Sequence, residues 1–122
     1  MKLLQNSGVP IYQQIAATFR EEILTKKRKS GEYLPSIRGL AKELKISVIT
    51  TMKAYEMLEE EGFVTAVQGK GFIINTQDSS LLQEQYKRKI EENITMAIKS
   101  AKVLGLNKQE LTDMFELLWK MQ

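Results

Sequence analysis

Residues 36–62 read SIRGLAKELKISVITTMKAYEMLEEEG, and this stretch predicts two helices joined by a short turn. Ser36 follows a proline and suits a helix N-cap. The buried stripe of the first helix, about nine residues long, comprises Ile37, Leu40, Ala41 and Leu44. Ser47 caps a second helix over about residues 47–61, which stops at Gly62 and buries Thr51, Ala54, Tyr55 and Leu58. The two form a helix-turn-helix.

The flanking segments extend this unit on both sides. Pro10 to about Lys27 predicts an amphipathic helix, stopped by Ser30-Gly31. Residues 63–67 and 72–75 are short runs of β-branched and aromatic residues, and Gln68-Gly69-Lys70-Gly71 between them predicts a hairpin tip. The fold class is therefore mostly α with a small β-hairpin. The N-terminal part is a winged helix-turn-helix, in which the hairpin of residues 63–75 is the wing.

Residues 75–80 are polar and without pattern, which divides the chain into domains 1–76 and 77–122. A helix of some 25 residues follows and ends at Gly105. Asn107 and Glu110 then form a capping box that starts a last helix, with Leu106 and Leu111 at the staple positions. Both helices are amphipathic.

Composition excludes several classes of protein. The chain has neither cysteine nor histidine, so the commonest nucleophile, general base and soft metal ligands are missing, and we expect no enzyme, catalytic residue, metal or cofactor. No apolar run reaches the ~18 residues of a membrane span, and residues 1–6 do not read as a secretory signal. Residues 1–76 carry 11 Lys and Arg against 8 Asp and Glu, whereas residues 77–122 carry 7 of each, so the positive excess lies in the first part.

The helix that starts at Ser47 is the candidate reading element for double-stranded DNA, because a helix in the major groove contacts bases near its N-terminus. Its outward residues are Val48, Ile49, Met52 and Lys53, with Thr50 near the edge. Outward apolar side chains suit thymine methyl groups better than guanine. The alternative is that they pack on the wing or on another protein.

Phosphate contacts are expected around this helix. Arg38, in the first turn of the preceding helix, can meet a backbone phosphate together with free N–H groups. Lys42, Lys45 and Ser47 are weaker candidates, and Lys70 beside Gly69 can reach a minor groove. The alternative for each of them is an ordinary surface residue. We interpret the basic cluster at 26–29 as compensation of the preceding helix dipole rather than as a DNA contact.

The last two helices cannot bury both apolar stripes against each other, so we expect a homodimer. The dimerisation residues would be Leu82, Tyr86, Ile90, Ile94, Ile98, Leu111, Phe115, Leu118 and Trp119. The alternative is a helical hairpin that folds back on the winged helix.

Five segments follow one another over residues 9–76: PIYQQI at 10–15, LPSIRGLA at 34–41, AYEMLE at 54–59, EGFV at 61–64 and GKGF at 69–72. Together they resemble the N-terminal domain of GntR-family bacterial transcription regulators. The 46-residue tail resembles that of the YtrA subfamily, in which two helices form the dimer. Many members have arginine where this chain has Val48 and Met52, which disfavours guanine contacts from this helix.

The resemblance implies a cytoplasmic homodimeric repressor of an inverted-repeat operator, often beside transporter genes. It implies DNA contacts from the Pro-Ser-x-Arg motif, here Ser36 and Arg38, from the recognition-helix positions, and from Gly69 and Lys70 in the wing. A small-molecule effector is left open and nothing indicates one. The rival function is a winged helix that docks another protein through its outward apolar residues.

Overall fold

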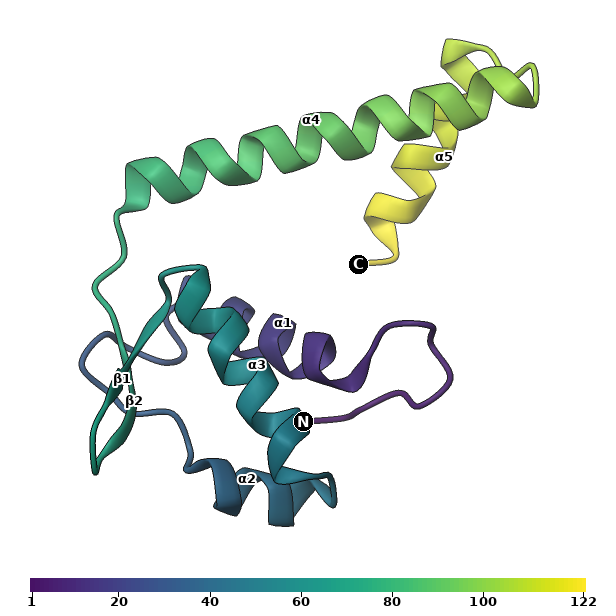
Figure 1. Ribbon diagram of the computed structural model, residues 1–122. Coiled ribbons are helices and arrows are strands. Elements are labelled where there is room, and N and C mark those ends of the chain that lie inside the picture. The colour runs from purple at the N-terminus through teal and green to yellow at the C-terminus, as the bar shows by residue number, and fades with distance from the viewer. The chain divides into compact units, whose positions relative to one another are not determined.

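The computed structural model describes the backbone of residues 1–122 and every side chain except that of Ser79. The chain divides into two compact units, Met1–Gln77 and Asp78–Gln122. The elements, labelled in Figure 1, are α1 (Ile11–Leu24), α2 (Ile37–Leu44), α3 (Val48–Glu60), β1 (Val64–Val67), β2 (Gly71–Ile74), α4 (Ser79–Val103) and α5 (Lys108–Lys120). The described chain is thus mostly helical with one antiparallel hairpin, as expected from the sequence.

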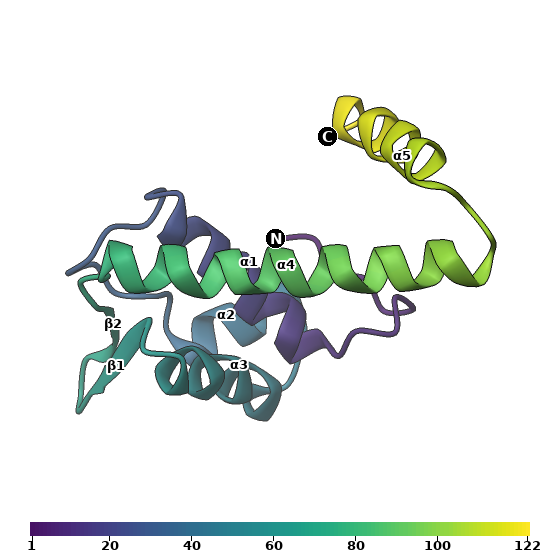
Figure 2. The same cartoon turned by 90° about the horizontal axis from the view of Figure 1, so that it is seen from above.

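Helix α3 is the centre of the first unit and packs against α1, α2 and β1 (Figures 1 and 2). Its predicted stripe of Thr51, Ala54, Tyr55 and Leu58 is fully buried. Phe19 of α1 and Phe72 of β2 meet the ring of Tyr55 edge-on, at centroid distances of 5.8 and 5.2 Å. Because such contacts add to the gain from burial, this aromatic row joins α1, the helix-turn-helix and the hairpin in one core.

Two serine caps set the start of the helix-turn-helix pair, as predicted. Ser36 Oγ accepts the Gly39 N–H at 3.0 Å, and Ser47 Oγ accepts the Thr50 N–H at 3.0 Å. Between the helices Lys45 adopts a left-handed backbone with φ of 57°. This conformation turns the chain sharply at a cost that glycine would avoid. In α2, Leu40 and Ala41 are buried, whereas Ile37 and Leu44 are only half-buried.

The hairpin pairs Val64 with Ile74 and Val67 with Gly71. A feature not predicted is an isolated antiparallel bridge between Tyr33 and Ile73, which brings the segment before α2 alongside β2. Gly31 N–H donates to the Ile74 carbonyl at 2.8 Å, and Ile74 N–H donates to the Glu32 carbonyl at 2.8 Å. The base of the wing is therefore held from both sides.

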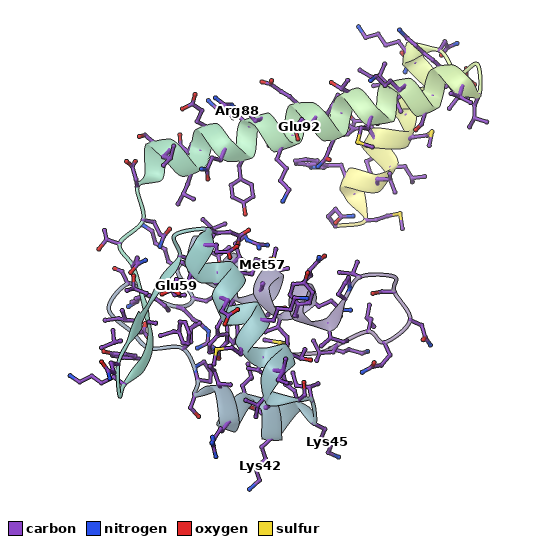
Figure 3. All side chains as sticks on the ribbon, viewed as in Figure 1. Lys42, Lys45, Met57, Glu59, Arg88 and Glu92 are labelled. Carbon is purple, nitrogen blue, oxygen red and sulfur yellow. The ribbon has the colours of Figure 1, made fainter. Side chains whose placement is uncertain are left out.

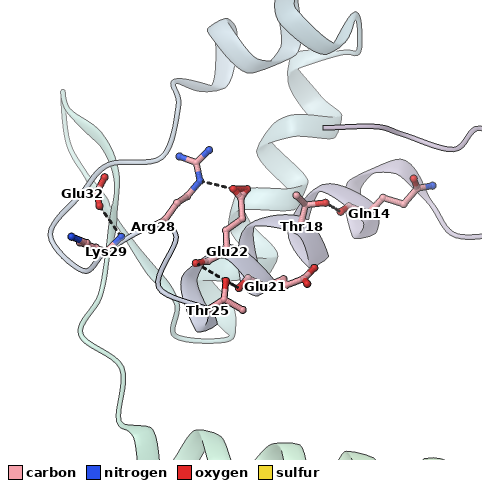
Figure 4. A network of polar contacts seen from close by, with 8 residues as sticks. All are labelled: Gln14, Thr18, Glu21, Glu22, Thr25, Arg28, Lys29 and Glu32. Carbon is pink, nitrogen blue, oxygen red and sulfur yellow. Dashed lines mark hydrogen bonds and ion pairs between the residues drawn. The ribbon is translucent and has the colours of Figure 1, made fainter. Parts of the chain in front are cut away.

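Helix α1 ends at Leu24, earlier than the predicted Lys27. Thr25 Oγ1 donates to the Glu21 carbonyl at 2.8 Å, and Lys26 then takes a left-handed backbone that ends the helix before Ser30-Gly31. No basic residue lies in the last turn of α1, and Lys26 and Lys27 follow its C-cap Thr25, so compensation of the helix dipole by the cluster 26–29 stays a prediction. Arg28 folds back onto Glu22 at 3.3 Å (Figure 4). Its guanidinium carbon lies 4.8 Å from the centroid of the Phe19 ring.

In the second unit, α4 begins at the cap Asp78, whose carboxylate accepts the Ser80 and Leu81 N–H groups. These hydrogen bonds, that of Leu81 first, lower the pKa of Asp78. The predicted capping box of Asn107 and Glu110 is confirmed at the start of α5. Among the described side chains of this unit, Ala101 is the buried apolar one. No described helix is long and apolar enough to cross a membrane.

Candidate DNA interface

The first turns of α3 present apolar side chains to solvent. Ile49 is 80% exposed, and Val48 and Met52 are exposed as well. These three residues lie opposite the buried stripe, as the sequence predicted. Apolar groups on an exposed helix face suit the methyl groups of thymine in a major groove.

Two hydroxyl groups, those of Ser47 and Thr50, lie at the start of α3 near these apolar side chains. Ser47 Oγ accepts the Thr50 N–H and donates its own proton to Thr50 Oγ1 at 2.8 Å. Thr50 Oγ1 is thereby used as an acceptor, which leaves its proton to donate outward. A phosphate oxygen or a base acceptor such as thymine O4 fits that proton.

The start of α2 is the second part of the candidate interface. Arg38 is exposed in the first turn of α2, two residues after Ser36, which caps this helix. A Cβ added at Gly39 would lie 2.7 Å from Ser36 Oγ, so a side chain there would displace the cap. Glycine at this position leaves Ser36 in its capping rotamer, two residues before Arg38.

Lysines extend this basic edge. Lys42 and Lys45 project from the end of α2 on the side where α3 begins (Figure 3). Lys70 is exposed at the wing tip, next to Gly69 with φ of 77°. Among the described side chains, no carboxylate forms an ion pair with Arg38 or with these three lysines. Their charge is therefore available to an anion.

Contacts within the core hold these parts in a fixed geometry. Tyr55 of α3 donates its hydroxyl proton to the Pro35 carbonyl at 2.7 Å, immediately before the Ser36 cap. Burial raises the pKa of Tyr55, so its hydroxyl stays protonated in the folded chain. Glu59 of α3 accepts the Ala66 N–H at 2.7 Å and so ties the helix to the wing. Neither tie was predicted from the sequence, because no periodic pattern signals the pairing of Tyr55 with Pro35, 20 residues away, or of Glu59 with Ala66, seven residues away.

Lys53 is exposed, as predicted, and its side chain leans toward α1. Its ammonium lies 4.2 Å from the centroid of the Tyr12 ring. Tyr12 was missed as a neighbour of the interface. The signal in the sequence was weak: Tyr12 lies off the buried stripe of α1 that contains Ile15 and Phe19.

The residues predicted for dimerisation form two groups. Leu82, Tyr86 and Leu111 are half-buried. The six exposed ones are Ile90, Ile94, Ile98, Phe115, Leu118 and Trp119. Phe115 and Trp119 stack at a centroid distance of 5.6 Å, and Trp119 is still 69% exposed. The two helices thus present a large apolar surface.

Known proteins are similar to this chain in sequence and in fold. The family described as bacterial regulatory proteins, gntR family, matches residues 11–74. The HTH-type transcriptional repressor YtrA of Bacillus subtilis is 33% identical over 105 residues, which cover 86% of this chain and 81% of YtrA. A GntR family transcriptional regulator from Listeria monocytogenes is 28% identical with a TM-score of 0.71, covering 91% of this chain and 96% of that one.

A further solved structure is similar in fold alone. It is AraR(DBD) in complex with operator ORX1, at 24% identity and a TM-score of 0.53, covering 61% of this chain and 89% of that one. These relatives are transcription regulators, not enzymes. The chain belongs to the GntR family, in its YtrA-like subfamily, and is a DNA-binding transcription regulator with a winged helix-turn-helix.

Proposed function

We propose that this regulator acts as a homodimeric repressor that places two copies of α3 in successive major grooves of an operator with twofold symmetry. The observation that carries the proposal is the first part of α3, where exposed Val48, Ile49 and Met52 lie beside the hydroxyl group of Thr50. In this arrangement the apolar residues contact bases and the surrounding donors contact phosphates. The repressor role follows the name of YtrA, the similar protein of Bacillus subtilis.

The phosphate contacts come from two elements that flank α3. Arg38 and the capped Ser36 lie at the start of α2, and Lys70 lies at the wing tip beside Gly69. A tip of this kind suits a minor groove, because Gly69 adds no side chain to the approach of the backbone. Glu59 lies at the end of α3 opposite to Val48 and Ile49, so in this docking the acidic end of the helix would lie away from DNA.

The dimer is supported by the apolar surface of the second unit. Ile90 and Ile94 are more than half exposed on α4, as are Phe115 and Trp119 on α5. Surfaces of this kind usually belong to an interface, and a twofold dimer is the commonest closed solution. A dimer also matches DNA, because half-sites about 34 Å apart fall on the same side of the duplex.

Selection of bound fragments from the host genome tests the function. We expect one motif with inverted-repeat symmetry. If about six phosphates are contacted per dimer, the logarithm of affinity should fall with the logarithm of salt concentration at a slope of about −5. Arg38→Ala should weaken binding to all sequences alike, whereas Ile49→Ala should change the preference among sites. A flat salt dependence, or the reverse behaviour of these two variants, would contradict the proposal.

The dimer is tested by a charge in the apolar surface. Ile94→Glu should shift sedimentation from dimer to monomer, because the interface would have to desolvate a carboxylate. Thr95→Glu is the matched control, since Thr95 is exposed on the next helical position and donates to the Glu91 carbonyl. A dimer that survives Ile94→Glu as well as Thr95→Glu would place the interface elsewhere. The rival function, docking of another protein through α3, gains no support from the relatives.

A further inference from the structure

Tyr12 and Lys53 form a contact between α1 and the recognition helix. The Lys53 ammonium lies 4.2 Å from the centroid of the Tyr12 ring, within the range of a cation–π interaction. Lys53 is exposed and Tyr12 is half-buried. No described carboxylate pairs with Lys53. The ring therefore holds the ammonium at the edge of α3 without neutralising its charge.

The Tyr12 hydroxyl can still donate a hydrogen bond. Gln13 Nε2 donates to Tyr12 Oη at 3.1 Å, so the oxygen is used as an acceptor. Within the described part of the chain, no hydrogen bond uses the Tyr12 hydroxyl proton. A phenol whose oxygen accepts one bond still donates its proton to a second partner. Tyr12 therefore presents a donor beside the Lys53 cation.

Thr50 adds a third donor on the side of α3 that contains Lys53. It lies three residues before Lys53, a spacing that places two side chains on one face of a helix. Its hydroxyl oxygen accepts the Ser47 proton at 2.8 Å, which leaves the Thr50 proton free. Tyr12, Thr50 and Lys53 thus combine two hydroxyl donors and one cation.

We propose that Tyr12, Thr50 and Lys53 form a binding site for a backbone phosphate of DNA at the flank of α3. The inference rests on the proposed docking of α3 in the major groove. A phosphodiester is an anion that only accepts hydrogen bonds, which matches three donors. Tyr12 belongs to α1, which lies outside the groove in that docking, so the contact is to the backbone rather than to a base. The ring also restricts Lys53 before DNA binds, which lowers the entropy lost on contact.

Two substitutions separate the hydroxyl from the charge. Tyr12→Phe keeps the ring and removes only the proposed donor, and Lys53→Gln removes the cation. Their matched controls are Tyr33→Phe, which removes a hydroxyl from an exposed ring near the wing base, and Lys27→Gln, which removes an exposed charge from the loop after α1. Each protein is titrated by fluorescence anisotropy against the selected operator and a random duplex of about 30 base pairs, near three helical turns.

The expected results differ between the two variants. Tyr12→Phe should bind both duplexes about a hundredfold more weakly per dimer, because each of the two protomers loses one hydrogen bond to a charged group, and the salt slope should stay unchanged. Lys53→Gln should make the slope shallower by about 1.8 for the dimer, at about 0.9 per phosphate contact. Lys27→Gln and Tyr33→Phe should stay within about twofold of the wild type, since neither touches a phosphate. All four should unfold at the wild-type temperature.

Three outcomes would overturn the site. Tyr12→Phe could match Tyr33→Phe, or Lys53→Gln could leave the slope where Lys27→Gln leaves it. An effect confined to the operator would show a base contact instead of a phosphate contact. Failure of the proposed function looks different, because the wild type itself would then bind without salt dependence. If the wild type and Arg38→Ala behave as proposed while Tyr12→Phe does not, only this site fails.

Discussion

The hydrogen bond from Tyr55 to the Pro35 carbonyl gives the sharpest test of how α3 holds α2 in place. Tyr55→Phe removes one hydroxyl and leaves the edge contacts of the ring with Phe19 and Phe72 in place. The loss comprises the net value of one hydrogen bond and part of the desolvation of a carbonyl left without its donor. Because Pro35 is half-buried and water reaches it in part, we expect the lower range, about 1–2 kcal/mol of unfolding free energy.

Urea unfolding followed by circular dichroism measures this change, and for a unit of this size each kcal/mol corresponds to about 4–8 °C in Tm. Fluorescence is unsuitable, because Trp119 is the single tryptophan and lies in the other unit. Amide exchange should quicken in α2 more than in α5, since only α2 loses its tie. Tyr33→Phe is the control, because no described hydrogen bond uses that hydroxyl. Equal urea midpoints for the Tyr55 and Tyr33 variants would refute the reasoning.

Three further predictions follow from the same contacts. Gly39→Ala gains about 1 kcal/mol of helix propensity and loses about as much by displacing the Ser36 cap, so the urea midpoint should stay near that of the wild type. The DNA affinity, measured by fluorescence anisotropy, should fall. An unchanged affinity would show that the Ser36 cap does not position Arg38. Lys45→Gly should raise the urea midpoint by relieving a left-handed backbone and yet weaken DNA binding, and a lower midpoint would contradict the strain. Above pH 10 the unfolded chain releases the Tyr55 proton before the folded chain does, so stability should fall as pH rises, and Tyr55→Phe should flatten that fall in urea titrations across the same range.

The parts of the fold that depend on local chemistry could be predicted from the sequence. Ser36, Ser47 and Asn107 cap helices through neighbours two or three residues away, so their signals lie within one window of sequence. The buried stripe of α3 followed from its period. The end of α1 could not be predicted, because a left-handed Lys26 and the return of Arg28 onto Glu22 decide it.

In the candidate site, too, some features depend on local sequence and others on contacts between distant residues. The exposure of Ile49 follows from helix period alone. The position of Lys53 depends on Tyr12, and the hold on α2 depends on Tyr55 reaching Pro35, which are contacts across 41 and 20 residues. Single-residue pairing such as that of Tyr33 with Ile73 has no periodic signal in a sequence. Such contacts appear only when the elements are packed.

The aromatic row of Phe19, Tyr55 and Phe72 joins the recognition helix to the wing strand through one buried core. A protein built this way has little freedom to change the separation between its helix tip and its wing tip, because closely packed cores resist deformation. The duplex must then supply the adjustment. Base pairs that neither element touches would be selected for how easily they bend or narrow, so the operator is read partly as a mechanical property of DNA.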